Sequence, residues 1–327
     1  MRIALIGPDK PDDFAYLIGR AANELGHSVD LLGPATWSPF PASRRVNAVA
    51  EVMTRDPRLG VKLARKAIKS AFSQPFDLII SVQSLRPEIV DELSRRVGPV
   101  VLWFPDHVSN LGPLWMFSAA YRAVFFKDPL LVQRLNNLGV NNIHYLAEAC
   151  DPIVHRPTDG QQLSSVAIVG NIYPTRAQLL ERLIRDSIPL KLYGGSYLGY
   201  LSPELRERHT GLYLRGLEKS SVFCNSIAVL NNLHPAEMTS MNARLFESTA
   251  AGALVVTEKR ETLSDYFAID TEVLAFTNYD ELMDRLRNAM SDPSVRKKLG
   301  PAASRRAHSD HTYAHRLASM FEVLELE

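Results

Sequence analysis

The residues best suited to chemistry are Arg244 and Glu247, which stand three positions apart on one face of a predicted helix. This helix ends at Gly252 and runs directly into an apolar segment, residues 254–257, that is typical of a buried strand. A helix start offers unpaired backbone N–H groups and the positive end of the helix dipole, which together suit a phosphate. An acid one turn further on could accept hydrogen bonds from ribose hydroxyls. The pair therefore indicates a site that holds a nucleotide by its diphosphate and its sugar.

The same pair has a plainer interpretation, a salt bridge between positions i and i+3 of a helix, worth about 0.2–0.5 kcal/mol. The remainder of the helix, Thr249-Ala-Ala-Gly-Ala253, consists of residues small enough to pack tightly against a sheet. A surface salt bridge needs no such burial, so the location favours the binding interpretation.

Two loops of the same half contain glycines that could approach a ligand. The loop 170–176 links a predicted strand to a predicted helix, and Gly170 allows its backbone to come close to a bound group. Arg176 stands in the first helical turn, where the dipole disfavours a cation unless an anion is present. A surface arginine paired with Glu181 or with solvent is an equally supported alternative. Gly194 begins a second glycine loop, which could also be a simple turn.

A polar segment, residues 231–242, leads into the helix of Arg244 and is long for a connection between a strand and a helix. Within it, His234 and Asn242 could donate hydrogen bonds to phosphate oxygens. A lone histidine is more often structural than functional, so spacing alone says little about His234.

Candidate catalytic groups follow strands of the first half. Asp106 and His107 come directly after the predicted strand 100–104, where an acid beside a histidine could act as a general base and its partner. An acid that caps the next turn is the favoured alternative, because acids at strand ends are common in both roles. The loop 7–13 contains three acids, including Asp13, but no G-x-G-x-x-G pattern, which disfavours a Rossmann dehydrogenase.

The elements that must position these loops alternate between strand and helix. Short apolar runs separated by helical patterns predict βαβ units and a parallel sheet in each half of the chain. Residues 151–165 are poor in large apolar side chains and predict a linker between the halves. Ligands of open α/β sheets bind at the carboxyl ends of the strands, where the loops described above lie.

Composition narrows the class of protein. The 327 residues, 46% hydrophobic and 22% charged, favour a globular enzyme of two domains. A net charge of +1 disfavours nucleic acid as a partner. Cys150 and Cys224 match no metal or redox spacing, so we expect a reduced, cytoplasmic setting. No apolar run reaches the length of a transmembrane helix, and residues 1–6 are too short for a signal peptide, while peripheral membrane contact stays open.

Three segments resemble the CgeB-like glycosyltransferases, a branch of the GT-B enzymes named for a spore maturation protein. They are Val166-Ala-Ile-Val-Gly-Asn-Ile-Tyr-Pro-Thr-Arg176, Ala228-Val-Leu-Asn231 leading to Asn242-Ala-Arg-Leu-Phe-Glu247 and Gly252, and the tail His311-Thr-Tyr-Ala-His-Arg316. The first half resembles the family only in its strand–helix rhythm and in Trp103-Phe-Pro-Asp106. Ala251 stands where the family often has cysteine.

The resemblance implies a GT-B fold, in which two Rossmann-like parallel-sheet domains face each other across a cleft. Residues 1–157 would form the acceptor-binding domain, residues 158–310 the nucleotide-sugar-binding domain, and residues 311–327 a last helix that crosses back onto the first domain. It also implies no cofactor and no metal, because helix N-termini and basic residues stabilise the leaving diphosphate instead.

Residue roles follow from the same motif match. Glu247 would bind the donor ribose, while Arg176, Arg244 and the backbone from Asn242 to Leu245 would hold the diphosphate. His234 would orient the sugar or a phosphate. The other donor-binding residues expected are Gly170, Asn171, Tyr173 and Gly194. Asp106 or His107 is the first candidate for the base of an inverting enzyme and Asp13 the second, whereas a retaining enzyme of this architecture needs no protein base.

The expected activity is therefore glycosyl transfer of the hexosyltransferase type, from a UDP- or dTDP-sugar to an acceptor hydroxyl on a glycan, protein, lipid or small molecule. Two alternatives stay open: a nucleotide-sugar epimerase or hydrolase of the same architecture, and a non-catalytic GT-B-like partner subunit. The sequence leaves the sugar, the base, the acceptor, the stereochemistry and the oligomeric state undecided.

Overall fold

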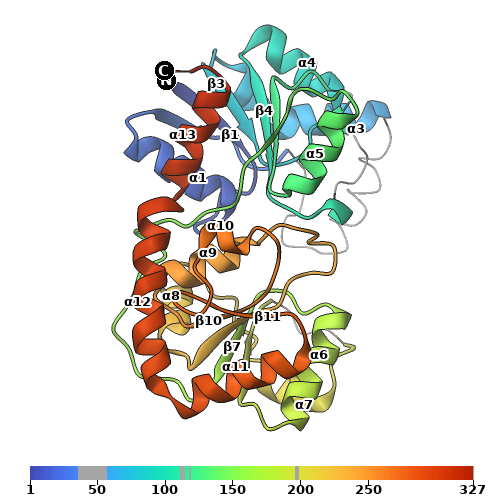
Figure 1. Cartoon of the computed structure of the whole chain (residues 1–327). Coiled ribbons are helices and arrows are strands. Elements are labelled where there is room, and N and C mark those ends of the chain that lie inside the picture. The colour runs from blue at the N-terminus through green and yellow to red at the C-terminus, as the bar shows by residue number, and fades with distance from the viewer. Residues whose placement is uncertain (36–56, 111–114, 118, 196–198, 327) are drawn as a thin grey trace. The chain divides into compact units, whose positions relative to one another are not determined.

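The computed structural model describes residues 1–35, 57–110, 115–117, 119–195 and 199–326 (Figure 1). The chain divides into two compact units, Met1–Ala147 with Arg316–Glu327, and Glu148–His315. The segment just after Ala147 belongs to the second unit because it is bonded there: Ser220 Oγ donates to the carbonyl of Val154 at 2.8 Å, and the Cys150 amide donates to the carbonyl of His311 at 2.9 Å.

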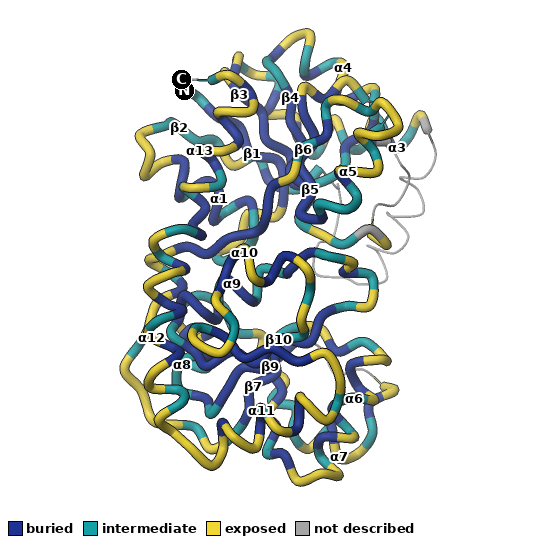
Figure 2. Tube along the Cα trace, in the orientation of Figure 1, coloured by how far each residue is buried: buried dark blue, intermediate teal, exposed yellow. Residues whose placement is uncertain are grey.

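The first unit is built on a six-stranded parallel sheet of order β2-β1-β3-β4-β5-β6. Its central strands are runs of buried apolar residues, as expected for a parallel sheet with helices on both faces (Figure 2). The strands are β1 Arg2–Ile6, β2 Ser28–Leu31, β3 Leu78–Ser81, β4 Val100–Phe104, β5 Ala123–Phe126 and β6 Ile143–Tyr145. The helices are α1 Phe14–Glu24, α3 Pro57–Ala67, α4 Pro87–Arg96, α5 Pro129–Asn137 and most of α13 Tyr313–Val323, with 3-10 turns η1 Lys69–Phe72, η2 Val108–Asn110 and η3 Trp115–Phe117.

The C-terminal residues pack within this first unit. The ring of Phe321 lies edge-on to His27 with centroids 5.2 Å apart, and the Arg122 guanidinium donates to the carbonyl of Leu324.

The second unit holds a five-stranded parallel sheet of order β11-β10-β9-β7-β8. Its strands are β7 Val166–Val169, β8 Leu190–Tyr193, β9 Ala228–Asn231, β10 Val255–Glu258 and β11 Leu274–Phe276. Its helices are α6 Pro174–Arg185, α7 Pro203–Arg208, α8 Gly216–Asn225, α9 Ala243–Ala250, α10 Leu263–Tyr266, α11 Tyr279–Ser291 and α12 Pro293–Asp310. Leucines of α6, α7 and α11 cover one face of the sheet, and α9 packs against α8 and α12 (Figure 1). The predicted pair of Rossmann-like parallel-sheet domains is confirmed. Within the described residues, no helix is both long and apolar enough to span a membrane.

In each sheet, the second strand of the unit is added on one side of the first strand and the later strands on its other side. The point at which the side changes is called the switch point. In the second unit β7 lies between β8 and β9, so the chain turns one way after β7 and the other way before β9. Ligands of open α/β sheets bind at such a switch point. Gly170, directly after β7, and Asn231, the last residue of β9, lie on either side of it.

Close packing of α12 on α9 fixes the helix that carries Arg244 and Glu247. A Cβ atom on Gly300 of α12 would lie 2.3 Å from the carbonyl oxygen of Gly252, which follows α9 at φ +80°. That oxygen belongs to the backbone and cannot turn aside as a flexible side chain could. Gly300 therefore allows an approach that no other residue permits.

We predict that Gly300→Ala destabilises the protein by about 1–3 kcal/mol, the range of overpacked core substitutions. In an open helix the same change would stabilise by about 1 kcal/mol, but at Gly300 both the carbonyl of Gly252 and Pro301, which follows directly in α12, oppose a Cβ atom. The measurement is urea unfolding followed by circular dichroism. Ser309→Ala, at an exposed position of the same helix, is the control and should change stability by less than about 0.5 kcal/mol. A stabilised Gly300→Ala variant would contradict the close contact.

Candidate functional site

The guanidinium of Arg244 lies against the backbone of Gly170 at the switch point of the second sheet. Its Nη1 donates to Oδ1 of Asn231 at 3.1 Å, and Asn231 is itself fully buried and bonded to Thr257. Gly170 has φ +103°, and a Cβ atom there would lie 2.5 Å from Nη2 of Arg244. Gly170 is thus required twice, for its left-handed backbone conformation and for the room it leaves to the arginine.

Arg176 is a second, deeply buried cation of the same loops. Its Nη1 donates to the carbonyl of Asn171 at 2.7 Å, and its Nη2 donates to the carbonyl of Asn232 at 2.6 Å. The guanidinium lies 4.8 Å from the ring centroid of Tyr173, and its Nε is buried with no hydrogen-bond partner within the described residues. The predicted alternative, a surface arginine paired with Glu181 or solvent, is wrong because only 3% of Arg176 is exposed.

The charge of Arg176 destabilises that of Arg244. Burial is the largest cause that lowers the pKa of Arg244, to about 9, and the positive charge of Arg176 is the second, while Glu247 opposes both. Burial also lowers the pKa of Arg176. Neither guanidinium forms an ion pair with a carboxylate in the part of the chain that the structure describes. Two such cations held together would be stabilised by a bound polyanion.

The N-terminus of α9 adds backbone donors beside Arg244. Asn242 is the N-cap, and its Oδ1 accepts a hydrogen bond from the Leu245 amide at 3.3 Å. This cap occupies the Leu245 amide that the sequence analysis assigned to the diphosphate, and the Leu245 side chain is buried. The amides of Ala243 and Arg244 precede it in the first turn, where no residue of the helix can accept from them. These two amides are the donors that the helix start offers to an anion.

Glu247 lies one turn along α9 and does not pair with Arg244. Its Oε1 contacts Nζ of Lys219 on α8 at 3.0 Å and Nε2 of His155 at 3.8 Å. The predicted alternative of a salt bridge between Arg244 and Glu247 is therefore wrong. Sequence reasoning missed both Lys219 and His155, although a lysine among small residues near a helix start was a signal for Lys219.

Tyr173, His234 and Gly194 complete the surroundings of the two arginines. The Tyr173 hydroxyl donates to the carbonyl of Leu233 at 2.6 Å, and its ring meets that of His234 edge-on with centroids 4.7 Å apart. His234 Nδ1 accepts from the Ala236 amide at 3.1 Å, which leaves Nε2 to carry the proton of a neutral ring. A Cβ atom on Gly194 would lie 2.8 Å from the carbonyl oxygen of Gly170, so the two glycine loops touch. The structure thus brings Gly170, Tyr173, Arg176, Gly194, His234 and Arg244 together, and their binding roles stay predictions.

The candidate catalytic residues of the first unit make local contacts. Asp106 accepts hydrogen bonds from the His107 amide at 3.1 Å and from Nδ2 of Asn110 at 2.7 Å, so it caps η2. His107 Nδ1 lies 2.7 Å from Oγ of Ser109, and Asp13 accepts from the Lys10 amide at 3.1 Å. These contacts agree with the favoured interpretation of Asp106 as an acid bonded to the turn that follows it, and its catalytic role stays a prediction. Its carboxylate remains 48% exposed.

The tail motif contributes His311, whose ring packs against helix α9. His311 ends α12, and its ring packs against those of Phe246, Tyr266 and Phe267 with centroids 5.2–5.6 Å apart. Its Nε2 bonds the carbonyl of Tyr266 at 2.8 Å. Because Phe246 is the neighbour of Glu247, this cluster fixes the helix turn that presents the carboxylate. The ring contacts, rather than helical or strand periodicity, account for the position of His311 in the tail motif.

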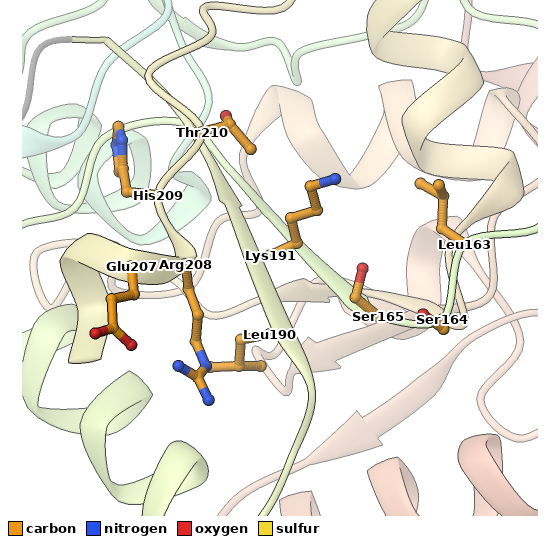
Figure 3. A pocket seen from close by; sticks show the side chains of 9 residues that line it. All are labelled: Leu163, Ser164, Ser165, Leu190, Lys191, Glu207, Arg208, His209 and Thr210. Carbon is orange, nitrogen blue, oxygen red and sulfur yellow. The ribbon is translucent and has the colours of Figure 1, made fainter.

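A separate hollow of about 330 Å³ lies at the opposite edge of the same sheet, beside the beginnings of β7 and β8. Lys191, Glu207 and Arg208 line it, and Figure 3 shows that their side chains point in different directions. It takes no part in the cluster around Gly170.

Comparison with known proteins places this geometry in context. The family described as glycosyl transferase-like matches residues 176–322. The structure of HepE from Anabaena in complex with UDP and glucose aligns over 99% of this chain and 99% of its own, with a TM-score of 0.69 and 14% identity. Sucrose-phosphate synthase from Thermosynechococcus elongatus aligns over 99% and 98%, with a TM-score of 0.68 and 14% identity. A glycosyltransferase from Rickettsia africae aligns over 100% and 99%, with a TM-score of 0.62 and 11% identity.

These structural matches define the fold class of the chain. The chain has the GT-B fold of two Rossmann-like parallel-sheet domains. No curated protein matches it in sequence.

Burial and the charge of Arg176 lower the pKa of Arg244, so this guanidinium should interact strongly with a bound anion. We predict that Arg244→Met weakens binding of pyrophosphate at pH 7 at least tenfold. Isothermal titration measures this, with Arg285→Met, which breaks an ion pair elsewhere in the unit, as the control. Unchanged affinity in Arg244→Met would contradict a role of this guanidinium in anion binding.

Proposed function

We propose that this protein is a glycosyltransferase that moves a sugar from a nucleotide diphosphate donor to an acceptor hydroxyl. The observation that carries the proposal is the pair Arg176 and Arg244, two cations held beside Gly170 at the switch point with neutral hydrogen-bond partners. A donor diphosphate is a polyanion whose negative charge complements this pair. The amides of Ala243 and Arg244 at the N-terminus of α9 offer it further hydrogen-bond donors.

Glycosyl transfer needs such a cluster because negative charge develops on the diphosphate as the sugar leaves. Positioned donors stabilise that charge in the transition state. Arg176, Arg244 and the first amides of α9 would do so here, with no metal ion and no further cofactor. Glu247 would accept from ribose hydroxyls, and His234 would orient the sugar or a phosphate through Nε2. Gly170, Asn171, Tyr173 and Gly194 would line the donor subsite.

UDP-sugars are the first donors to test, with dTDP-sugars second. Structures of HepE from Anabaena, which shares the fold, were solved with UDP and with UDP-glucose. The match to the glycosyl transferase-like family covers Arg176, Arg244 and Glu247. Membership of the CgeB-like branch, a hexosyl donor and a cytoplasmic setting are part of the same proposal. The first unit would bind the acceptor.

We predict that a nucleoside diphosphate stabilises the protein, by about 2.7 kcal/mol at a hundredfold excess over its Kd. The measurement is a thermal-shift screen of UDP, dTDP, GDP and ADP with and without EDTA, followed by calorimetry. EDTA should leave the shift unchanged. Arg176→Met and Arg244→Met should each weaken binding at least tenfold, since each removes a charged donor. Arg285→Met is the matched control, because it breaks an ion pair with Asp270 elsewhere in the unit. Absence of binding by every nucleotide at millimolar concentration would contradict the proposal.

Asp106 remains the first candidate for the base of an inverting reaction, followed by His107 and Asp13. We predict that Asp106→Asn lowers turnover at least 100-fold, the scale of general base catalysis, while Kd for UDP stays the same. Release of UDP from UDP-glucose, with water or an added acceptor, measures turnover, and analysis of the sugar product separates transfer from hydrolysis or epimerisation. Asn110→Ala removes one bond to Asp106 and controls for loss of the η2 cap. Full turnover in Asp106→Asn would remove Asp106 from the mechanism.

A further inference from the structure

We infer that Lys219, with His155, is a positioning residue that turns one oxygen of Glu247 toward the donor ribose. The inference rests on the proposed function, because it concerns how the nucleotide site is organised. It adds two residues that lie outside every motif recognised in the sequence. They come from α8 and from the segment that precedes β7, whereas Glu247 belongs to α9.

Lys219 lies in surroundings that are unfavourable for a lysine side chain. It lies in the second turn of α8 with 7% of its surface exposed, where burial opposes its charge and the helix dipole does not favour it. Its Nζ contacts Oε1 of Glu247 at 3.0 Å. The Glu247 side chain is 14% exposed, so the pair is largely shielded from water. In such surroundings the contact is strong enough to hold the carboxylate in one orientation.

His155 lies beside the same oxygen, beyond hydrogen-bond distance. Its ring is fully buried, and its Nδ1 accepts a hydrogen bond from the Asp151 amide at 3.0 Å. A neutral ring with Nδ1 as acceptor carries its proton on Nε2, which lies 3.8 Å from Oε1 of Glu247. The backbone of His155 is also tied down, since its amide donates to the Asp151 carbonyl and its carbonyl lies 2.9 Å from Nε2 of His308.

Lys219 and His155 both approach Oε1 rather than Oε2, and this asymmetry decides what Glu247 offers to a ligand. Within the described residues Oε2 makes no hydrogen bond or ion pair. Oε2 is therefore the oxygen available to a ribose hydroxyl, while Oε1 anchors the group. Lys219 and His155 act through Glu247 and need not touch the donor themselves. Supporting contacts of this kind set how well a binding group is oriented.

The test compares nucleotides with and without a ribose hydroxyl. It measures whether Lys219 determines how much that hydroxyl contributes to binding. Kd is measured by calorimetry for UDP, 2′-deoxy-UDP and 3′-deoxy-UDP. In the natural protein, removal of the contacted hydroxyl should weaken binding about tenfold or more, as for a hydrogen bond to a charged group. In Lys219→Met this ratio of Kd values should fall below about threefold, because the carboxylate is no longer held. Glu247→Gln should lower the ratio as well.

Further variants separate positioning from folding. Lys219→Arg keeps the cation and should restore most of the ratio. His155→Gln offers a neutral N–H donor in place of the ring and should retain more of it than His155→Ala. Arg285→Met, which breaks the distant ion pair with Asp270, should leave the ratio unchanged. These comparisons use ratios measured on the same variant, so a general loss of stability cancels.

Each outcome bears on one claim. A Lys219→Met variant that binds UDP with the natural ratio, while Glu247→Gln loses it, overturns the positioning role and leaves the donor site intact. If Lys219→Met does not fold, Lys219→Gln takes its place: a natural ratio in Lys219→Gln leads to the same conclusion, and a lowered ratio supports the inference. Failure of the natural protein to bind UDP, dTDP or any other nucleoside diphosphate overturns the proposed function instead.

Discussion

The site of the second unit depends on one electrostatic constraint, the proximity of two guanidinium groups that share no carboxylate. Burial and mutual repulsion lower the pKa of Arg244, and Arg176 is buried among carbonyl oxygens and an aromatic ring. Such an arrangement is unfavourable by itself, because charges removed from water need a partner. In the proposed function a bound diphosphate would be that partner. The local features described at the switch point, including the left-handed Gly170 and the contact of Gly194 with it, make room for this pair.

The rest of the unit holds the pair in place against its own repulsion. The buried strands β7 and β9 fix the two loops from which Gly170 and Asn231 emerge, and α9 is held by α12 on one side and by the aromatic cluster at His311 on another. The free energy gained by apolar packing over these surfaces is large compared with the electrostatic cost of holding the two cations together. Rigidity matters as well as stability, because donors fixed in advance need not reorganise when charge develops on a leaving group.

The two opposite charges on one face of α9 contact different partners. Arg244 and Glu247 have the spacing of a helix salt bridge, yet Arg244 turns to Asn231 and Glu247 turns to Lys219. In the proposed function, a direct bridge between them would neutralise the cation that holds the diphosphate and occupy the carboxylate that binds the ribose. Instead, the buried Lys219 on α8 contacts one oxygen of Glu247. Charge balance within the site is thus reached across two helices rather than along one.

The sequence by itself determined the two parallel sheets and the loops at their carboxyl ends, because hydrophobic periodicity is a local property. It also singled out Gly170, Arg176 and Arg244, whose proximity the structure shows and whose binding roles stay predictions. It could also weigh Asp106 as a capping acid. Only the tertiary structure decided which groups meet: Lys219 and His155 reach Glu247 from segments 28 and 92 positions away, and the Leu245 amide is taken by its own cap. The His311 tail had no local logic, since its partners Phe246, Tyr266 and Phe267 lie far along the chain. Contacts between distant segments depend on the crossover topology of the sheet, which no single stretch of sequence encodes.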